Sequence, residues 1–96
     1  MNIYGYDFEG PYNSPDQVPE YPGVYTVWCS SGGILLDVGQ AENVQERLKY
    51  HDRKDCWEKY CSEPLHFYVT KEPDEIQRCS LESKIRIEHN PPCGKK

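Results

Sequence analysis

Long apolar runs are missing from this sequence. No stretch approaches the roughly 18 apolar residues that a membrane-spanning helix needs, and no apolar signal-peptide core follows the N-terminus. We therefore expect a cytoplasmic protein without membrane contact. Aliphatic residues are also scarce, since Leu, Ile, Val and Phe make up about a fifth of the 96 residues, close to the composition of disordered chains. Eight Tyr and two Trp offset this shortage because aromatic side chains bury large areas, and we expect one small folded domain.

Positive charge is absent from the first half of the chain. Residues 1–46 contain seven acidic residues and no Lys or Arg, whereas residues 47–96 contain all eleven Lys and Arg together with nine acidic residues. The net charge of −5 argues against a high-affinity, free-standing nucleic-acid binder, because such proteins neutralise phosphates with Lys and Arg. Any phosphate contact has to come mainly from the second half, beginning at Arg47.

Closely spaced cysteine pairs are absent, and the number of cysteines is odd. In a cytoplasmic protein, the five cysteines are expected to be reduced thiols rather than a disulfide framework. A zinc site is the alternative, because His51, Cys56 and Cys61 lie close together in the sequence. Their intervals are longer than the paired cysteine spacings of structural zinc sites, so we do not expect zinc.

Proline and glycine are concentrated in residues 1–21, among acidic and tyrosine residues. This density excludes a long helix or a central strand. Disordered tails are usually poor in aromatic residues, so we expect an extended segment that packs on the rest of the chain. The aromatic residues that would hold it are Tyr4, Tyr6, Phe8 and Tyr12. We therefore divide the chain into an acidic N-terminal arm, residues 1–21, and a domain over residues 22–96.

Strand-like and helix-like patterns alternate along this domain. β-Branched and aromatic residues predict strands over residues 23–28, 34–38 and 65–70. Asn43 and Glu46 form a capping-box pattern that begins a helix. A short helix capped by Asp52 or Asp55 follows, and a last helix has Pro73 in its first turn. The order β-β-α-(α)-β-α predicts an α+β fold with a small, three-stranded, mainly antiparallel sheet flanked by helices.

Several charged residues lie four positions apart on the predicted helices. Arg47 and His51 project from the same helix face and could bind a phosphate, although the same spacing is typical of an ordinary wet helix surface. Glu82 lies four residues from both Arg78 and Arg86. From spacing alone, Glu82 belongs to a solvated ladder of ion pairs that contributes little energy.

The order of short motifs in residues 22–94 resembles the GIY-YIG endonuclease family. Members carry a G-[IV]-Y strand, a Y-[IV]-G strand, a helix with an arginine, and a later helix with a metal-binding glutamate before a proline-rich end. The corresponding segments here are Gly23-Val24-Tyr25, Asp37-Val38-Gly39, the stretch from Gly39 to Leu48 that contains Arg47, Leu81-Glu82-Ser83-Lys84-Ile85, and Asn90-Pro91-Pro92. The resemblance implies a GIY-YIG-like fold.

The resemblance also implies a metal-dependent endonuclease that hydrolyses phosphodiester bonds in DNA, with RNA as the other candidate substrate. Glu82 would hold a single Mg²⁺ or Mn²⁺, hard ions suited to a carboxylate and several waters. Arg47 would brace the phosphate, because a guanidinium matches phosphate oxygens. Tyr25 would lie near the attacking water as a base or a proton relay. His51 falls where family members have a tyrosine or a histidine, and it suits proton transfer.

Three positions depart from the family pattern. Asp37 stands where the family has its second tyrosine, either as a second carboxylate near the metal or as a charge that repels phosphate. Gln40 replaces a commonly basic residue, and Gly94 falls at the place of the usual asparagine. The alternative function is therefore a catalytically impaired module that binds nucleic acid or a protein. Targeting would come from a protein partner, a dimer or the shape of the substrate.

Overall fold

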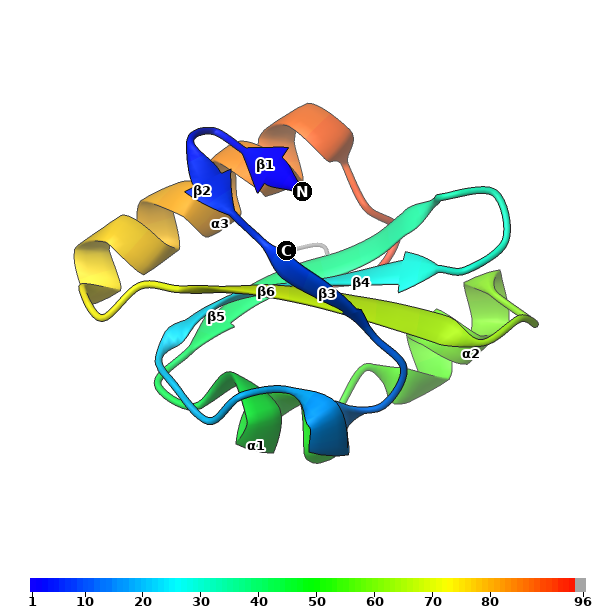
Figure 1. Cartoon of the computed structure of the whole chain (residues 1–96). Coiled ribbons are helices and arrows are strands. Elements are labelled where there is room, and N and C mark those ends of the chain that lie inside the picture. The colour runs from blue at the N-terminus through cyan, green and yellow to red at the C-terminus, as the bar shows by residue number, and fades with distance from the viewer. Residues whose placement is uncertain (95–96) are drawn as a thin grey trace.

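The computed structural model describes residues 1–94, and most of its strands precede its first α-helix (Figure 1). The elements in chain order are β1 (Asn2–Ile3), β2 (Tyr6–Asp7), β3 (Glu9–Tyr12), the 3₁₀ turn η1 (Pro15–Gln17), β4 (Gly23–Cys29), β5 (Leu35–Ala41), α1 (Val44–Lys49), α2 (Lys54–Tyr60), β6 (Leu65–Lys71) and α3 (Glu75–His89). The predicted order of strands and helices after the arm is therefore present.

Helix caps explain where the helices begin. The side-chain oxygen of Asn43 accepts a hydrogen bond from the backbone N–H of Glu46 at 3.1 Å, so α1 begins at the predicted cap. Neither predicted aspartate caps α2, because Arg53 occupies its N-cap without a side-chain hydrogen bond. Helix α3 begins after Asp74, whose side chain accepts from two backbone N–H groups of the first turn. Pro73 therefore precedes this helix and does not lie in its first turn.

Strands β3, β6, β4 and β5 form one antiparallel sheet in that spatial order. We predicted three strands, and the fourth, β3, comes from the N-terminal arm. Glu9 of β3 lies opposite Val69, and Tyr12 lies opposite Phe67. Pro11 is compatible with this pairing because β3 is an edge strand, where a missing backbone N–H is tolerated. The arm thus supplies one edge of the sheet and β5 the other.

The aromatic residues of the arm differ in burial. Phe8 is buried, Tyr6 and Tyr12 are half-buried, and Tyr4 is exposed, so the first three of these aromatic residues pack on the rest of the chain. Val18 of the arm is also buried in the core. Strands β1 and β2 pair with each other in a separate two-stranded sheet. The division of the chain after residue 21 stays a prediction.

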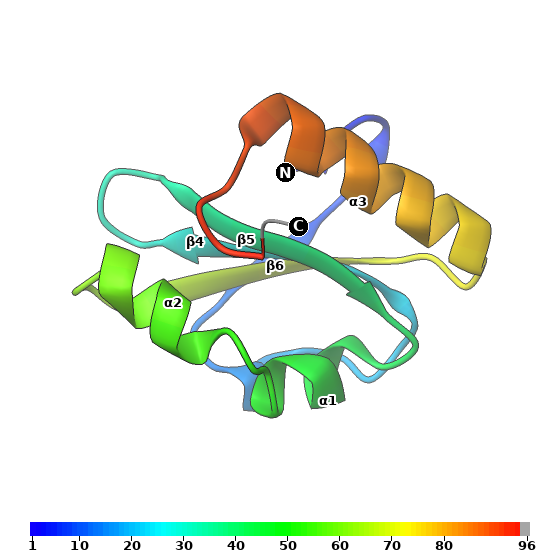
Figure 2. The same cartoon turned by 180° about the vertical axis from the view of Figure 1, so that it is seen from behind.

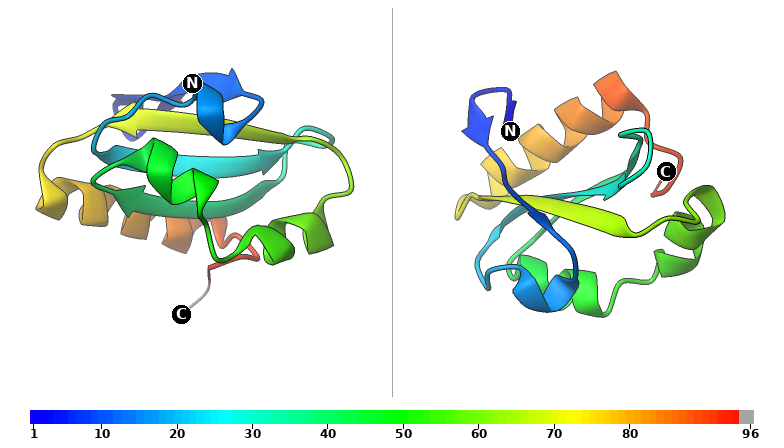
Figure 3. Two further views of the ribbon diagram at one scale, coloured as in Figure 1. Left: turned by 90° about the horizontal axis from the view of Figure 1, so that it is seen from below. Right: turned by 45° about the vertical axis from the view of Figure 1, so that its right-hand side comes forward.

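Helix α3 covers one face of the sheet, and α1 and α2 cover the other (Figures 1 and 2). Side chains alternate along β4, so Val24 packs toward Leu81 of α3 while Tyr25 packs toward Leu48 and Trp57 on the opposite face. Figure 3 shows the same layers from two further directions. None of the helices within residues 1–94 is long and apolar enough to cross a membrane.

Two disulfides join segments that lie far apart in the sequence. Cys29 at the end of β4 is bonded to Cys61 after α2, and Cys56 of α2 is bonded to Cys93. Cys79 is exposed and unpaired. The expectation of five reduced thiols is therefore wrong for four of them, because the fold brings together cysteines whose spacing gives no sign of pairing. The segment that leaves α3 runs past β5 toward α2 (Figure 2), and in it the backbone N–H of Cys93 donates to the carbonyl oxygen of Leu36 in β5.

Candidate functional site

Tyr25 and His51 form a buried hydrogen-bonded pair on the sheet face that α1 and α2 cover. Tyr25 Oη lies 2.6 Å from His51 Nε2, and the two residues are 1% and 5% exposed. Tyr25 lies opposite Gly39 of β5, and a Cβ atom on Gly39 would be 2.1 Å from the Tyr25 hydroxyl oxygen. Only glycine leaves room for the tyrosine at this point, which explains the glycine of the second motif.

The hydrogen bonds of His51 define its tautomer. The backbone N–H of Arg53 donates to His51 Nδ1 at 3.0 Å. Because Nδ1 accepts, the neutral imidazole carries its proton on Nε2 and donates it to Tyr25 Oη. The hydroxyl proton of Tyr25 is then left to donate to another acceptor. The pair therefore presents a phenol O–H held in place by histidine.

Burial and nearby charges keep both groups neutral at pH 7. Burial, followed by the positive charges of Arg53 and Arg47, lowers the pKa of His51 to about 4. Burial and the negative charge of Asp37 raise the pKa of Tyr25 to about 12, while Arg53 and Arg47 act in the opposite direction. With this pKa, the Tyr25 hydroxyl keeps its proton at pH 7, so it suits the expected part of a proton relay better than that of a base.

Acidification is expected to destabilise the protein through His51. The pKa of this histidine is about 4 in the folded state and 6.5 as an ordinary value, so between these values the unfolded chain binds the proton more tightly. Its contribution to the free energy of unfolding is fully present above pH 6.5 and falls by about 2 kcal/mol between pH 7 and pH 5. Urea unfolding at both pH values measures this loss. The free energy of unfolding of His51→Gln should fall less between pH 7 and pH 5 than that of the wild type, by about 2 kcal/mol. An equal loss in the two proteins would contradict the assignment.

Asp37 is fully buried, and its carboxylate is held by donors from several elements. Oδ2 accepts hydrogen bonds from Arg53 Nε at 2.8 Å and from Trp57 Nε1 at 2.9 Å. Oδ1 accepts from the backbone N–H of Val38 at 2.8 Å and lies 3.7 Å from Arg86 Nη2. A buried carboxylate needs such partners because an unpaired buried charge is costly. Both oxygens of Asp37 are therefore occupied by protein donors.

Arg86 links Asp37 to Glu82 across the edge strand β5. Arg86 Nη2 lies 3.5 Å from Glu82 Oε2, and Nη1 donates to the carbonyl oxygens of Cys93 and Gly94 at 3.2 Å and 2.7 Å. The side chain of Glu82 is 20% exposed, so it borders solvent without pointing away from the protein. Glu82 is thus connected through Arg86 to the carboxylate that holds Arg53.

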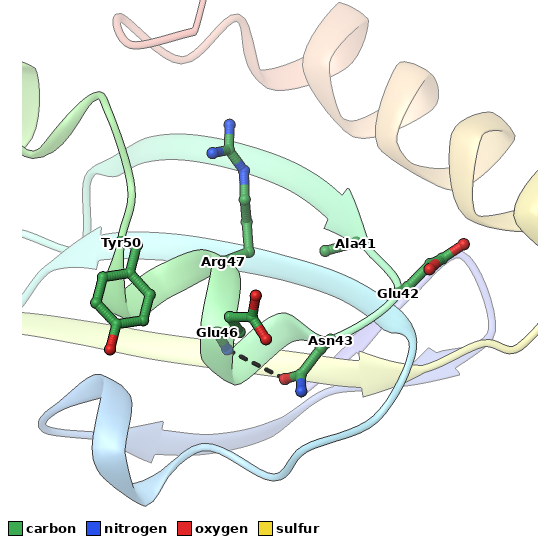
Figure 4. A pocket seen from close by; sticks show the side chains of 6 residues that line it. All are labelled: Ala41, Glu42, Asn43, Glu46, Arg47 and Tyr50. Atoms are coloured by element: carbon green, nitrogen blue, oxygen red, sulfur yellow. Dashed lines mark hydrogen bonds between the residues drawn. The ribbon is translucent and has the colours of Figure 1, made fainter.

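Arg47 lies on α1 beside a surface cavity (Figure 4). The cavity has a volume of about 470 Å³ and is lined by Ala41, Glu42, Asn43, Glu46, Arg47 and Tyr50. Arg47 Nη2 forms a partly exposed ion pair with Asp52 Oδ1 at 3.4 Å. Exposed pairs of this kind contribute little energy, so Arg47 can exchange this carboxylate for a phosphate at low cost.

Gln40 lies apart from the other predicted site residues. Its side-chain oxygen accepts a hydrogen bond from Arg78 Nε at 3.0 Å, on the α3 face of the sheet. Because side chains alternate along β5, Gln40 and Asp37 point to opposite faces. The residues that the fold connects are Tyr25, His51, Asp37, Arg47 and, through Arg86, Glu82.

Two residues that hold Asp37 cannot be recognised as its partners from the sequence. Arg53 and Trp57 both bond to Asp37, but neither lies at a helical or strand spacing from it. Arg86 was visible only as the neighbour of Glu82 on the predicted last helix. A buried aspartate in a strand is the one feature that could have prompted a search for an arginine partner.

The comparisons with known proteins identify the fold. No family model matches this sequence, and no curated protein is detectably similar to it. Among solved structures, a similar one is the GIY-YIG N-terminal endonuclease domain of UvrC from Thermotoga maritima, a point mutant bound to its catalytic divalent cation. The match covers 81% of this chain and 87% of that chain, with a TM-score of 0.62 and 20% sequence identity. The prediction of a GIY-YIG-like α+β fold is therefore confirmed.

Proposed function

We propose that this protein is a metal-dependent endonuclease that hydrolyses phosphodiester bonds in DNA. The observation that carries the proposal is the pair of Tyr25 and His51, 2.6 Å apart, on a GIY-YIG-like fold. The charges of Arg47 and Arg53 act on both members of this pair. Guanidinium groups beside a hydroxyl donor suit a phosphodiester, because negative charge develops on its oxygens during hydrolysis.

The residues of this chain have separate tasks in this proposal. Arg47 binds a phosphate oxygen, since its guanidinium stays ionised and matches phosphate geometry. Tyr25 directs its O–H toward the attacking water or a phosphate oxygen. His51 stays neutral and holds the Tyr25 oxygen through Nε2–H, which fixes the direction of the phenol.

Glu82 fits a role as the ligand of a single Mg²⁺ or Mn²⁺. Its Oε2 has one long contact with Arg86, and its Oε1 has no partner among residues 1–94. No group of three or more ligating side chains gathers within that part of the chain, so a bound ion would keep several waters, as Mg²⁺ does. Asp37 has both oxygens occupied and is left out of the ligand set. A bound divalent cation supplies a Lewis acid that polarises the phosphate.

The net charge of the protein bears on how it would reach a nucleic-acid substrate. The net charge of −5 limits affinity for nucleic acid, so a protein partner or the shape of the substrate provides targeting in this proposal, and RNA is the other candidate substrate.

The cytoplasmic location stays a prediction. The two disulfides weigh against it, because disulfides persist mainly in oxidising compartments.

A second candidate function, a module that binds nucleic acid without cutting it, is favoured by one observation. Tyr25 and His51 are 1% and 5% exposed, so a substrate phosphate can touch them only after the surrounding side chains move. A buried pair of this kind also packs a core, and the aromatic ring of Trp57 lies 4.6 Å from that of His51. Cleavage assays separate the two candidates.

The test is cleavage of plasmid and branched DNA with Mg²⁺ or Mn²⁺ by the wild type and by Glu82→Gln. We expect the wild type to cut only with metal, and the variant to cut at least about 100-fold more slowly, because charge stabilisation by the ion is worth several kcal/mol. Glu88→Gln is the matched control, since this residue is exposed on the same helix. Equal cutting by both variants would contradict the role of Glu82, and no cutting by the wild type would favour the binding module.

A further inference from the structure

Asp37 uses its buried carboxylate to fix the guanidinium of Arg53. Arg53 Nε donates to Oδ2 at 2.8 Å and Nη2 donates to Oδ1 at 3.4 Å, so two donors on one edge of the guanidinium face the same carboxylate. Trp57 Nε1 donates to Oδ2 and prevents the carboxylate from turning away. Charge-assisted pairs with two contacts impose direction as well as energy. The Arg53 side chain is therefore held in one orientation.

This orientation places Arg53 beside the proposed reacting groups and at the protein surface. Its Nη2 lies 3.4 Å from His51 Nε2, the atom that bonds to Tyr25. Its side chain is 28% exposed, and Nη1 has no hydrogen-bond partner among the described residues. Because a guanidinium has five N–H donors, several remain for a ligand after Asp37 is satisfied. These donors belong to a partly exposed side chain that lies next to the Tyr25 and His51 pair.

We propose that Arg53 is a second phosphate-binding residue of the site and that Asp37 is its positioning residue. The inference rests on the proposed function, because the ligand is a phosphate of the nucleic-acid backbone. Arg53 and Arg47, whose charges both act on Tyr25, contact neighbouring phosphate oxygens. In this arrangement, Asp37 neither repels the substrate nor binds metal, since its charge is offset by Arg53 and Arg86. The pair of Asp37 and Arg53 takes the place of the tyrosine in the second motif.

The test measures binding of a fluorescent single-stranded oligonucleotide in EDTA at several salt concentrations, so that affinity is independent of cleavage. We expect Arg53→Gln to weaken binding about tenfold. The negative slope of the logarithm of the binding constant against the logarithm of the salt concentration should become shallower by about 0.7, the value of one lost phosphate contact. Arg53→Lys keeps the charge but loses the planar fork, so it should keep the slope and lose part of the affinity. Arg47→Gln should match Arg53→Gln.

Lys59→Gln is the matched control, because it removes one positive charge from the exposed surface of α2, the helix that Arg53 precedes as N-cap. If Arg53→Gln fails to fold, the double variant Arg53→Gln with Asp37→Asn removes both members of the buried pair and should show the same loss of slope. An unchanged slope and affinity for Arg53→Gln, equal to those of Lys59→Gln, would overturn the inference and assign Arg53 only to packing around Asp37.

The results also distinguish this inference from the endonuclease proposal. A wild type that binds but does not cut, with a reduced slope for Arg53→Gln, supports the phosphate contact and contradicts the nuclease. A wild type that cuts, with an unchanged slope for Arg53→Gln, contradicts the phosphate contact alone. A wild type that binds no nucleic acid in EDTA or with Mg²⁺ contradicts both.

Discussion

Reduction of both disulfides is expected to lower the free energy of unfolding of this protein by roughly 4 to 8 kcal/mol, which is comparable with the whole stability of a small domain. The bond from Cys29 to Cys61 spans a sequence separation of 32, and the bond from Cys56 to Cys93 spans 37. Each bond restricts the unfolded chain, and loops of this length are worth about 2 to 4 kcal/mol apiece in the chain-entropy account. The scarce aliphatic core leaves little to compensate for their loss.

Urea unfolding with and without a phosphine reductant measures this effect, together with titration of thiols in the denatured protein. The structure leads us to expect one titratable thiol, Cys79, before reduction and five thiols after it. Cys79→Ser is the matched control, because it removes an exposed, unpaired cysteine and should leave the response to reductant unchanged. Five thiols in the untreated protein, with no response to reductant, would show that the cysteines are reduced as the composition suggested.

Asp37→Asn is expected to lower the free energy of unfolding by about 3 to 5 kcal/mol. The substitution removes the negative charge that Arg53 and Arg86 face, and it leaves two guanidinium groups beside a neutral, fully buried amide. The amide also turns its NH₂ group toward at least one of the groups that now donate hydrogen bonds to Asp37, such as Trp57 Nε1. Two donors then face each other without an acceptor. Breaking one side of a buried ion pair costs more than the pair itself contributes, which is why the expected loss is large.

Chemical unfolding of Asp37→Asn at pH 7 gives the size of this loss. Asp7→Asn is the control, because the side chain of Asp7 is 88% exposed and its ion pair with the N-terminus should change stability by less than about 1 kcal/mol. Similar stability of the two variants would show that the buried carboxylate is not held by Arg53 and Trp57. A stable Asp37→Asn protein would also remove the basis for Asp37 as a positioning residue.

Local patterns in the sequence were sufficient for most of the secondary structure. The β-branched run of β4, the glycines of the following turn and the cap formed by Asn43 and Glu46 act within a few residues of one another, so they can be read without the fold. The start of α3 was misplaced, because Asp74 caps this helix and Pro73 therefore precedes the first turn in which we expected it. The motif order also led to the GIY-YIG-like fold, which the solved structure of the UvrC domain confirms.

The sequence by itself determined the fold class, the order of its elements and a list of candidate site residues with Tyr25, Arg47, His51 and Glu82 among them. Tertiary structure alone decided which of these residues touch, and through which partners. The bond of Asp37 to Arg53, the pairing of β3 with β6 and the two disulfides all join residues distant in the sequence or outside any regular spacing. Such contacts depend on packing and on the need of a buried charge for a partner. Neither requirement produces a regular spacing of residues that could be recognised in the sequence.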